Sequence, residues 1–521
     1  MYGKVTGACL QGVEGNLIEV EVNLMSGLPQ MTIVGLPDSA VRESVERVRA
    51  ALKNCEYKFP LERITVNLAP ADMRKEGASF DLAIAVGLIG TSGQIRLAGL
   101  EKCLVAGELA LDGSLRPIPG VLSMVEAARK RGYTHVMLPR MNAPEARLIE
   151  GIEVIGLTHL NELREGTELA AWADRETIKS GSESVNRRGV KDLGEEYAGL
   201  EDFADVSGQQ HAKRALLLAA TGMHNILLVG PPGSGKTMLA RRLPSILPPL
   251  TDQEALEVTK IYSAAGAIVD RSQFIRVRPF RSPHHTISPG GLVGAGSIPK
   301  PGEISLAHKG VLYLDEMPEF PRYVLEALRQ PLEDRRVTIS RAKAVFTFPA
   351  HFIMAASMNP CPCGYFGSDP GGVACTCSPL KVQNYRARLS GPLLDRIDMH
   401  VEVPRVDLHT LSEPSASGWS SAEMRERMLV ALERQAHRYA GLPVRFNGEL
   451  AGRLLRDVCA IPAEAERMLL QSFDALGLSV RAHDRILKLA RTLADLDDSS
   501  RIRTEHIAEA IQYRVLDKKW G

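Results

Sequence analysis

Residues 230–237, GPPGSGKT, have the types and spacing of a loop that cradles phosphate groups. Glycines let backbone N–H groups approach a phosphate closely, a lysine at position 236 can reach the β and γ phosphates, and a threonine at 237 can ligate Mg²⁺. A strand-like run, NILLV, precedes the loop and a helix-like run, TMLARRL, follows it. This context favours nucleotide binding over a fortuitous glycine-rich turn. The expected nucleotide contacts are Gly230, Pro231, Pro232, Gly233, Ser234, Gly235, Lys236 and Thr237.

Two further apolar runs end in polar residues that suit hydrolysis of the nucleotide. In GVLYLDEMPEF, the apolar run is followed by Asp315 and Glu316. We expect Asp315 to hold the magnesium shell and Glu316 to activate the attacking water. HFIMAASMNP ends in Asn359, which could orient that water or simply be a turn asparagine before proline. In LSGPLLDRIDMHVEVP, Arg396 stands between acids. It could form an intramolecular ion pair or reach a neighbouring subunit's nucleotide.

Four of the eight cysteines fall within one short stretch, CPCGYFGSDPGGVACTC. Four thiolates satisfy tetrahedral zinc, and a Gly- and Pro-rich loop without a core of its own gains from such a staple. The C-x-C spacing departs from common zinc knuckles, so a loop of reduced cysteines and a redox switch stay open as alternatives. The expected zinc ligands are Cys361, Cys363, Cys375 and Cys377.

The elements that must position these residues belong to a multidomain chain. With 521 residues and 45% hydrophobic content, the chain can bury two or three cores. We expect an α/β domain over 1–165, a polar linker over 166–200, a second α/β region over 201–400 and a helical remainder over 401–521. The 63 basic and 62 acidic residues leave no global polyanion signature, so any nucleic-acid contact must be local. No apolar run is long enough for a membrane span and the N-terminus lacks a signal sequence, which predicts a cytoplasmic protein without membrane contact.

The order of these motifs resembles that of AAA+ ATPases: phosphate-binding loop, Asp-Glu strand end, Asn strand tip, LLDRID and a later SVRAHD. PFRSPHHTIS, MNPCPCG and SGPLLDRIDMHVEVP look more closely like the magnesium-chelatase-like branch known as the ComM or YifB family. The likeness covers essentially the whole chain. It implies a P-loop AAA+ core with a parallel sheet and a C-terminal α-helical lid. It also implies Asn359 as sensor 1, Arg396 as arginine finger and Arg481 as sensor 2, with Arg485 competing for the last role.

Two insertions gain meaning from the same resemblance. RRVTISRAKAVFTF alternates like a hairpin, which in related ring motors points into the pore. Its cations, expected to contact DNA, are Arg335, Arg336, Arg341 and Lys343. ISPGGLVGAGSIPKPGEIS is similar to the helix-2 insertion of this branch and adds Lys300. An ordinary solvated hairpin and a flexible surface loop are the alternatives. His284 and His285 would point to opposite faces of a strand, which argues against a shared metal.

The N-terminal half resembles the proteolytic domain of Lon-type proteases, an α/β fold of the ribosomal S5 domain 2-like kind. The resemblance rests on MRKEGASFDLAIAVGLI and CLVAGELALDGSLRPIPGVLSMVEAARKRG. Ser79 falls on the nucleophile position, but the position of the general-base lysine is Leu122, which cannot take a proton. Lys75 is close in sequence, although the family pattern does not use it as the base. We therefore expect an inactive domain. Recombination ATPases of the RadA type carry a similar one.

The resemblance implies an ATPase that uses ATP and Mg²⁺ and assembles into a homo-oligomer, expected to be a hexamer. Its expected partner is single-stranded or branched DNA, with recombinases or other DNA-processing proteins as further partners. The implied activity is that of a branch-migration helicase in recombination and natural transformation. The competing classes are an ATP-driven remodeller of a protein partner, as in chelatases, and an ATP-dependent protease, which Leu122 disfavours.

Overall fold

The computed structural model describes residues 1–96, 99–164, 199–296, 299–341, 344–367, 374–405 and 419–514. The linker expected at 166–200 falls almost entirely outside these ranges. No helix in the described part of the chain is long and apolar enough to cross a membrane.

The N-terminal part is a seven-stranded mixed sheet with the order β3-β4-β2-β1-β5-β8-β9. Its strands are β1 (Tyr2–Gln11), β2 (Glu14–Met25), β3 (Gln30–Val34), β4 (Arg63–Ala69), β5 (Cys103–Val105), β8 (His135–Pro139) and β9 (Glu153–Leu157). The side chains of β2 alternate between two faces, and Ile18, Val20, Val22 and Leu24 are all buried. A small antiparallel pair, β6 (Glu108–Leu109) and β7 (Leu115–Arg116), completes this part.

The helices of the N-terminal part are α1 (Ser39–Asn54), α2 (Asp81–Thr91), α3 (Val121–Lys130) and α4 (Ala143–Ala146). Helix α1 buries an apolar stripe that includes Val41, Val48 and Leu52. The helix starts at Asp38, whose Oδ1 accepts a hydrogen bond of 2.7 Å from the backbone N–H of Val41. Helix α2 is buried along almost its whole length and packs against β1 and β2.

The central part is a five-stranded, wholly parallel sheet with the order β11-β12-β15-β10-β16. Its strands are β10 (Ile226–Val229), β11 (Phe280–Arg281), β12 (Val311–Leu314), β15 (Ile353–Met358) and β16 (Met399–Glu402). Strands β10, β12 and β15 are short and apolar, as is typical of a parallel sheet covered on both faces. The sheet places the carboxyl ends of these three strands side by side at one edge.

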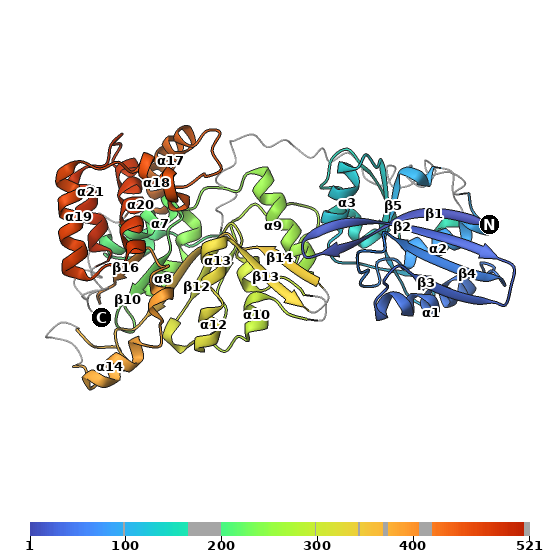
Figure 1. Cartoon of the computed structure of the whole chain (residues 1–521), viewed down its shortest axis with the longest axis horizontal. Helices are drawn as coiled ribbons and strands as arrows, with labels where there is room; N and C mark the ends of the chain where they lie inside the picture. Colours follow the sequence, from blue (N-terminus) through green and yellow to red (C-terminus); the bar gives the residue numbers. More distant parts are fainter. Residues whose placement is uncertain are drawn as a thin grey trace.

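Helices and one hairpin surround this sheet (Figure 1). The helices are α7 (Gln210–Gly222), α8 (Lys236–Arg241), α9 (Asp252–Ala265), α10 (Pro289–Val293), α11 (Glu303–Leu306), α12 (Arg322–Glu326), α13 (Arg329–Asp334), α14 (Pro379–Arg386) and α15 (Gly391–Leu394). The predicted hairpin is present as β13 (Arg336–Arg341) and β14 (Ala344–Pro349), paired antiparallel. Its buried face carries Val337, Ile339, Phe346 and Phe348.

The C-terminal part is helical, as predicted, and stacks beside the central sheet near α7 (Figure 1). Its helices are α17 (Ser421–Arg438), α18 (Gly452–Val458), α19 (Ala463–Leu476), α20 (Val480–Leu496) and α21 (Thr504–Gln512). Ser420 caps α17 with a capping box that also uses Glu423. Helix α20 buries Ile486, Leu489 and Leu493 on one stripe.

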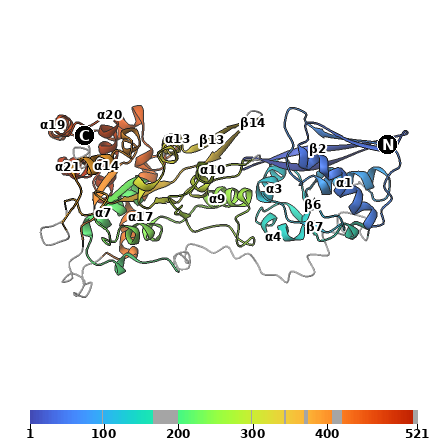
Figure 2. The ribbon, with the colours of Figure 1, turned by 90° about the horizontal axis from the view of Figure 1, so that it is seen from below.

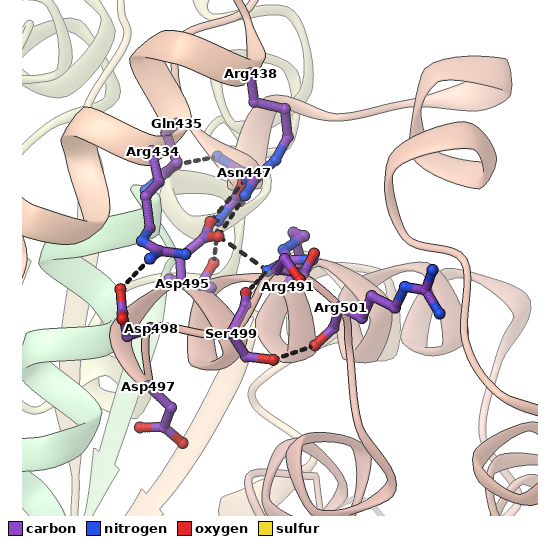
Figure 3. A network of polar contacts seen from close by, with 12 residues as sticks. Arg434, Gln435, Arg438, Asn447, Arg491, Asp495, Asp497, Asp498, Ser499 and Arg501 are labelled. Atoms are coloured by element: carbon purple, nitrogen blue, oxygen red, sulfur yellow. Dashed lines mark hydrogen bonds and ion pairs between the residues drawn. The ribbon is translucent and has the colours of Figure 1, made fainter.

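A buried carboxylate, Asp495 of α20, holds the helical part together (Figure 3). Its Oδ2 accepts hydrogen bonds from Arg438 Nη1 of α17 at 2.8 Å and from Asn447 Nδ2 at 2.9 Å. Its Oδ1 accepts a hydrogen bond of 3.0 Å from Arg491 Nη2. Because Asp495 has no exposed side-chain surface, these partners offset its desolvation.

The N-terminal and central parts meet where α3 lies against α9 (Figures 1 and 2). Lys260 of α9 forms ion pairs with Glu126 of α3 at 2.9 Å and with Glu14 at 3.1 Å. The backbone N–H of Gly120 donates to Ser263 O at 3.1 Å. A second contact joins the β1–β2 turn to the hairpin, since a Cβ at Gly12 would stand 3.1 Å from the carbonyl oxygen of Thr347. The N-terminal part therefore touches both α9 and the hairpin.

Candidate nucleotide-binding site

The loop after β10 lies at the sheet edge where β12 and β15 also end. Lys236, the first residue of α8, is largely buried, and its ammonium donates to the carbonyl oxygens of Gly230 and Pro231, both at 2.8 Å. It also lies 3.3 Å from Asn359 Oδ1 at the end of β15. Burial lowers the pKa of Lys236, while Asp315 and Glu316 act in the opposite direction. The structure thus brings together residues that the sequence spaces far apart.

Thr237 and Asp315 form the pair of oxygen donors that magnesium would require. The Thr237 hydroxyl donates to Asp315 Oδ2 at 3.0 Å. Tyr313 OH donates to the other carboxylate oxygen, Oδ1, at 3.0 Å, and the Ser357 hydroxyl donates to the same oxygen. Burial raises the pKa of Tyr313, which keeps its hydroxyl a donor. The carboxylate of Asp315 is therefore fixed by groups from β12, β15 and α8.

Glu316, directly after Asp315, is exposed at the same edge. Its backbone has a φ of 50°, in the left-handed region that non-glycine residues adopt rarely. Its N–H donates to Ser357 Oγ at 3.2 Å and to Asp315 Oδ1 at 3.1 Å. These bonds hold the strained turn, from which the Glu316 side chain is exposed next to Asp315.

Asn359 leads directly into the cysteine-bearing loop. The sulfur of Cys361 lies 3.3 Å from that of Cys363 and 3.7 Å from that of Cys375. The sulfurs of Cys363 and Cys375 are 3.5 Å apart. All four sulfurs, including that of Cys377, lie within 4.8 Å of one another. Tetrahedral zinc with bonds of about 2.3 Å spaces its sulfurs by roughly 3.8 Å, so the arrangement fits such an ion. Backbone N–H groups of Tyr365 and Thr376 lower the pKa of Cys363 to about 6. The pKa values of Cys375 and Cys377 are raised instead, because burial and the neighbouring sulfurs outweigh the backbone hydrogen bonds that these two thiols accept.

Arg396 and Arg481 share one carboxylate, that of Glu333 at the end of α13. Arg396 Nη2 lies 2.6 Å from Glu333 Oε2, and Arg481 Nη2 lies 3.5 Å from Oε1. Arg396 also donates to Pro392 O at 2.7 Å and is only 7% exposed, whereas Arg481 is 54% exposed. The neighbouring arginines lower the pKa of Glu333, with Arg396 as the main cause. Arg485 instead pairs with the buried Asp398 and is 17% exposed.

The hairpin presents exposed cations at both ends of β13. Arg336 lies on the exposed face with Thr338, whereas Arg341 lies at the turn end of the strand, beyond the buried Val337 and Ile339. Arg335 lies at the base, in a left-handed conformation, and pairs with Glu449 at 3.2 Å. Lys343 lies outside the described residues. Lys300 is exposed, and its insertion packs beside the hairpin, because a Cβ at Gly294 would stand 2.4 Å from Lys300 O and 3.1 Å from Ile339 Cδ1.

Comparison with known proteins places this geometry in a family. Residues 202–411 match the family described as magnesium chelatase, subunit ChlI, residues 20–142 match subunit ChlI of Mg-chelatase, and residues 418–514 match its C-terminal region. The chain is 43% identical over 508 residues to the competence protein ComM of Haemophilus influenzae, which covers 97% of this chain and 96% of the relative. It is 42% identical over 507 residues to the uncharacterized protein YifB of Salmonella typhimurium, with the same coverage.

The chain belongs to the ComM/YifB family. As a magnesium-chelatase-like AAA+ protein it is an ATPase that uses ATP and Mg²⁺. The fold class predicted from the sequence is thereby confirmed: a Lon-protease-like α/β part, a P-loop AAA+ core with a parallel sheet, and a helical C-terminal part. The Lon likeness is direct, since the chain is 28% identical over 173 residues to the Lon protease of Roseiflexus castenholzii. That match covers 31% of this chain and 21% of the protease.

In the Lon-like part of this ComM/YifB-family chain, the serine at the nucleophile position is hydrogen-bonded to the backbone. Ser79 is buried, and its hydroxyl donates to the carbonyl oxygen of Ala8 at 3.0 Å. Leu122 is fully buried in α3, the helix that packs against α9. Lys75 is buried too, but its ammonium donates to the carbonyl oxygens of Pro70 and Met73. Burial lowers the pKa of Lys75.

His284 and His285 do not lie in a strand, contrary to the prediction. Strand β11 ends at Arg281, so the two side chains need not point apart. Their ring centroids lie 4.0 Å from each other, with His285 also edge-on to Phe320. The only described cluster of three or more metal-type side chains is nevertheless that of the four cysteines.

Sequence reasoning missed three residues of the site. Ser357 and Tyr313 reach Asp315 across strands, and Glu333 collects two arginines from distant segments. Ser357 had a signal, because it is the one polar residue in the apolar strand IMAASM. The signal for Tyr313 was weaker: its side chain carries a hydroxyl group in a buried strand, two residues before Asp315. Glu333 had none, since its partners depend on tertiary structure.

Proposed function

We propose that this chain is an ATP-hydrolysing ring motor that acts on DNA, as a branch-migration helicase in homologous recombination and natural transformation. The observation that carries the proposal is the arrangement of Lys236, Thr237, Asp315 and Asn359 at one sheet edge, in a chain whose hairpin exposes Arg336 and Arg341. The name of the Haemophilus relative, a competence protein, agrees with a role in DNA uptake and recombination.

In the proposed reaction the residues of the edge divide the work. Lys236 would exchange its carbonyl partners for the β and γ phosphates, and the backbone N–H groups of residues 233–237 would surround them. Thr237 and Asp315 would hold the Mg²⁺ shell. The bound metal would neutralise charge on the phosphates. Glu316 would accept a proton from the attacking water, which Asn359 would orient.

The arginines support a ring. An arginine finger stabilises charge on the transferred phosphoryl group, and Arg396 would supply it to the nucleotide of a neighbouring subunit in a hexamer. Arg481 is the better choice for sensor 2, because Arg485 is already engaged by buried Asp398 while Arg481 is half exposed. In the isolated chain Glu333 occupies Arg396 and Arg481, and phosphate would compete for both.

DNA would be held by cations that touch phosphates and do not read bases. Arg336 and Arg341 on the hairpin and Lys300 on the adjoining insertion are the exposed cations suited to this, with Lys343 proposed from sequence alone. Arg335 is less suited, because Glu449 pairs with it at the base of the hairpin. The buried hydroxyl of Ser79 and the buried Leu122 speak against proteolysis.

We also propose that Cys361, Cys363, Cys375 and Cys377 hold a structural zinc ion. The mutual sulfur distances suit a closed tetrahedral site, which leaves no position for a substrate. Purified untagged protein should then contain about one zinc per chain by elemental analysis. A zinc content near zero from metal-replete, reducing conditions would support a loop of reduced cysteines.

A second candidate is an ATP-driven remodeller of a protein partner, which the chelatase descriptions of the matched families favour. ATPase assays with single-stranded and branched DNA separate the two. A DNA motor should be stimulated by DNA, whereas the remodeller should neither respond to it nor bind it at low salt. Lys236→Ala should abolish nucleotide binding, and Glu316→Gln should bind ATP without turning it over. An active Glu316→Gln variant would overturn the assignment of the base.

A further inference from the structure

The cysteine-bearing loop lies directly against the phosphate-binding loop. Gly364, one residue after Cys363, has a φ of 88°, and a Cβ there would stand 2.5 Å from Cδ and 2.7 Å from Cγ of Pro232. Such distances leave no room for a side chain. The backbone of the cysteine turn is therefore packed on the ring of Pro232, in the middle of the loop that would hold the phosphates.

The same turn is fixed on its other sides. The N–H of Gly364 donates to Cys361 O at 3.0 Å, and the Cys361 side chain is fully buried. Arg386 of α14 donates from Nε to Pro360 O at 3.3 Å, and its guanidinium lies 5.1 Å from the ring centre of Phe366. The turn is thus held between the P-loop, α14 and the four sulfurs.

We propose that the four-cysteine metal site braces the phosphate-binding loop, so that metal occupancy sets the affinity for nucleotide. Cys375 and Cys377 stand at the other end of the same loop and would tie the turn of Cys361 and Cys363 in place through the ion. With the ion gone, the packing of Gly364 on Pro232 loses this support. Nucleotide binding must then order both loops, which weakens it. The inference rests on the zinc site and the ATP site proposed above.

Removal of the distal ligands tests the brace. The double variant Cys375→Ser/Cys377→Ser leaves the chain from Asn359 to Gly364 unaltered. We expect the full-length variant to lose its zinc in elemental analysis and to bind a non-hydrolysable ATP analogue about tenfold more weakly in calorimetry. Added Zn²⁺ should not restore the affinity.

A matched pair of glycine variants separates the contact from the metal. Gly364→Ala keeps all four cysteines but forces a methyl group against Pro232, so it should retain zinc and still weaken nucleotide binding. Gly367→Ala is the control, because Gly367 also has a positive φ, 76°, but a Cβ there meets nothing within 4 Å. Backbone strain is thus present in both, and Gly367→Ala should bind nucleotide as the wild type does.

The outcomes distinguish the proposals from one another. If the cysteine variant loses zinc yet keeps wild-type nucleotide affinity, the brace is overturned while the zinc site and the ATPase stand. Equal nucleotide affinity of Gly364→Ala and Gly367→Ala overturns it as well. A wild-type protein without zinc overturns the brace together with the metal site. Failure of the wild type to bind nucleotide would instead remove the ATP site.

Discussion

Arg396 and Glu333 form an ion pair of 2.6 Å between the segment after α15 and the end of α13. Arg481 of α20 reaches the other oxygen of the same carboxylate. Glu333 stands three residues before Arg336, where the hairpin begins. One side chain therefore connects both proposed nucleotide-sensing arginines to the element proposed to touch DNA. A shift of α13 would change the surroundings of Arg396, of Arg481 and of the hairpin.

Replacement of Arg396 tests the proposed finger. Arg396→Ala should keep ATP affinity, because no described contact joins Arg396 to the phosphate-binding loop of its own chain, and should lower turnover by about 10³-fold. Arg396→Lys should also be slow, since an ammonium lacks the planar fork of a guanidinium. Steady-state ATPase and nucleotide-binding assays measure the two effects.

Arg434→Ala is the matched control for Arg396→Ala. Arg434 also forms an ion pair, with Asp498 on the surface of the helical part, and it has no proposed role in catalysis. Its replacement should leave turnover unchanged. Wild-type turnover in Arg396→Ala would show that the ion pair with Glu333 is the only role of this arginine.

The exposed hairpin cations supply the second prediction. Arg336→Ala/Arg341→Ala should weaken binding of single-stranded DNA and make the fall of affinity with salt less steep, because fewer counterions are released. Basal ATPase should persist, since neither side chain contacts the nucleotide edge in the described structure. Fluorescence anisotropy at several salt concentrations measures both quantities.

The control for the hairpin is Arg453→Ala on α18, because Arg453 is 89% exposed and pairs only within its own helix, with Asp457. It should leave DNA affinity and its salt dependence at wild-type values. A double hairpin variant that behaves like Arg453→Ala would make the hairpin an ordinary solvated element.

The third prediction concerns the buried network of the helical part (Figure 3). Asp495→Asn removes the charge that Arg438 and Arg491 share, and should destabilise this part by about 3–5 kcal/mol, because two cations lose their buried partner. Asp498→Asn is the matched control. Asp498 is 74% exposed, and its removal should cost under about 1 kcal/mol. Urea unfolding with limited proteolysis would show whether the two variants differ; equal stability would contradict the role given to Asp495.

The sequence predicted what local spacing determines. The residues of the phosphate-binding loop are contiguous, so their geometry follows from a strand, a glycine turn and a helix. Asp315 and Asn359 could be placed because carboxyl ends of parallel strands meet at one edge. Ser357 and Tyr313 depend on the register between β12 and β15, which the sequence does not specify. The shared carboxylate of Glu333 and the contact of Gly364 with Pro232 arise only when distant segments pack. No pattern in the sequence predicts them.

The last prediction concerns pH and the joint between the central sheet and the helical part. His224, just before β10, is fully buried, and its Nε2 lies 2.8 Å from Thr492 Oγ1 of α20. Burial lowers its pKa from 6.5 to about 4; Lys488 and Arg485 act in the same direction and Asp398 opposes them. The folded protein therefore keeps this imidazole neutral at pH values where the unfolded chain protonates it.

The sign of the effect follows from proton binding. Between about pH 6.5 and 4 the unfolded state binds more protons at His224, so the stability that this residue contributes is present above pH 6.5 and is lost as the pH falls towards 4. The loss should reach about 2 kcal/mol at pH 5.

His224→Asn cannot titrate in this range. It should be less stable than the wild type at pH 7.5, because it leaves a small cavity, but should lose less stability on acidification. Urea unfolding of both proteins at pH 7.5 and 5 measures the difference. Because Asp398 and the other carboxylates are present in both proteins, their titration is common to both. Parallel losses in wild type and variant would show that His224 is not the group that makes this joint sensitive to acid.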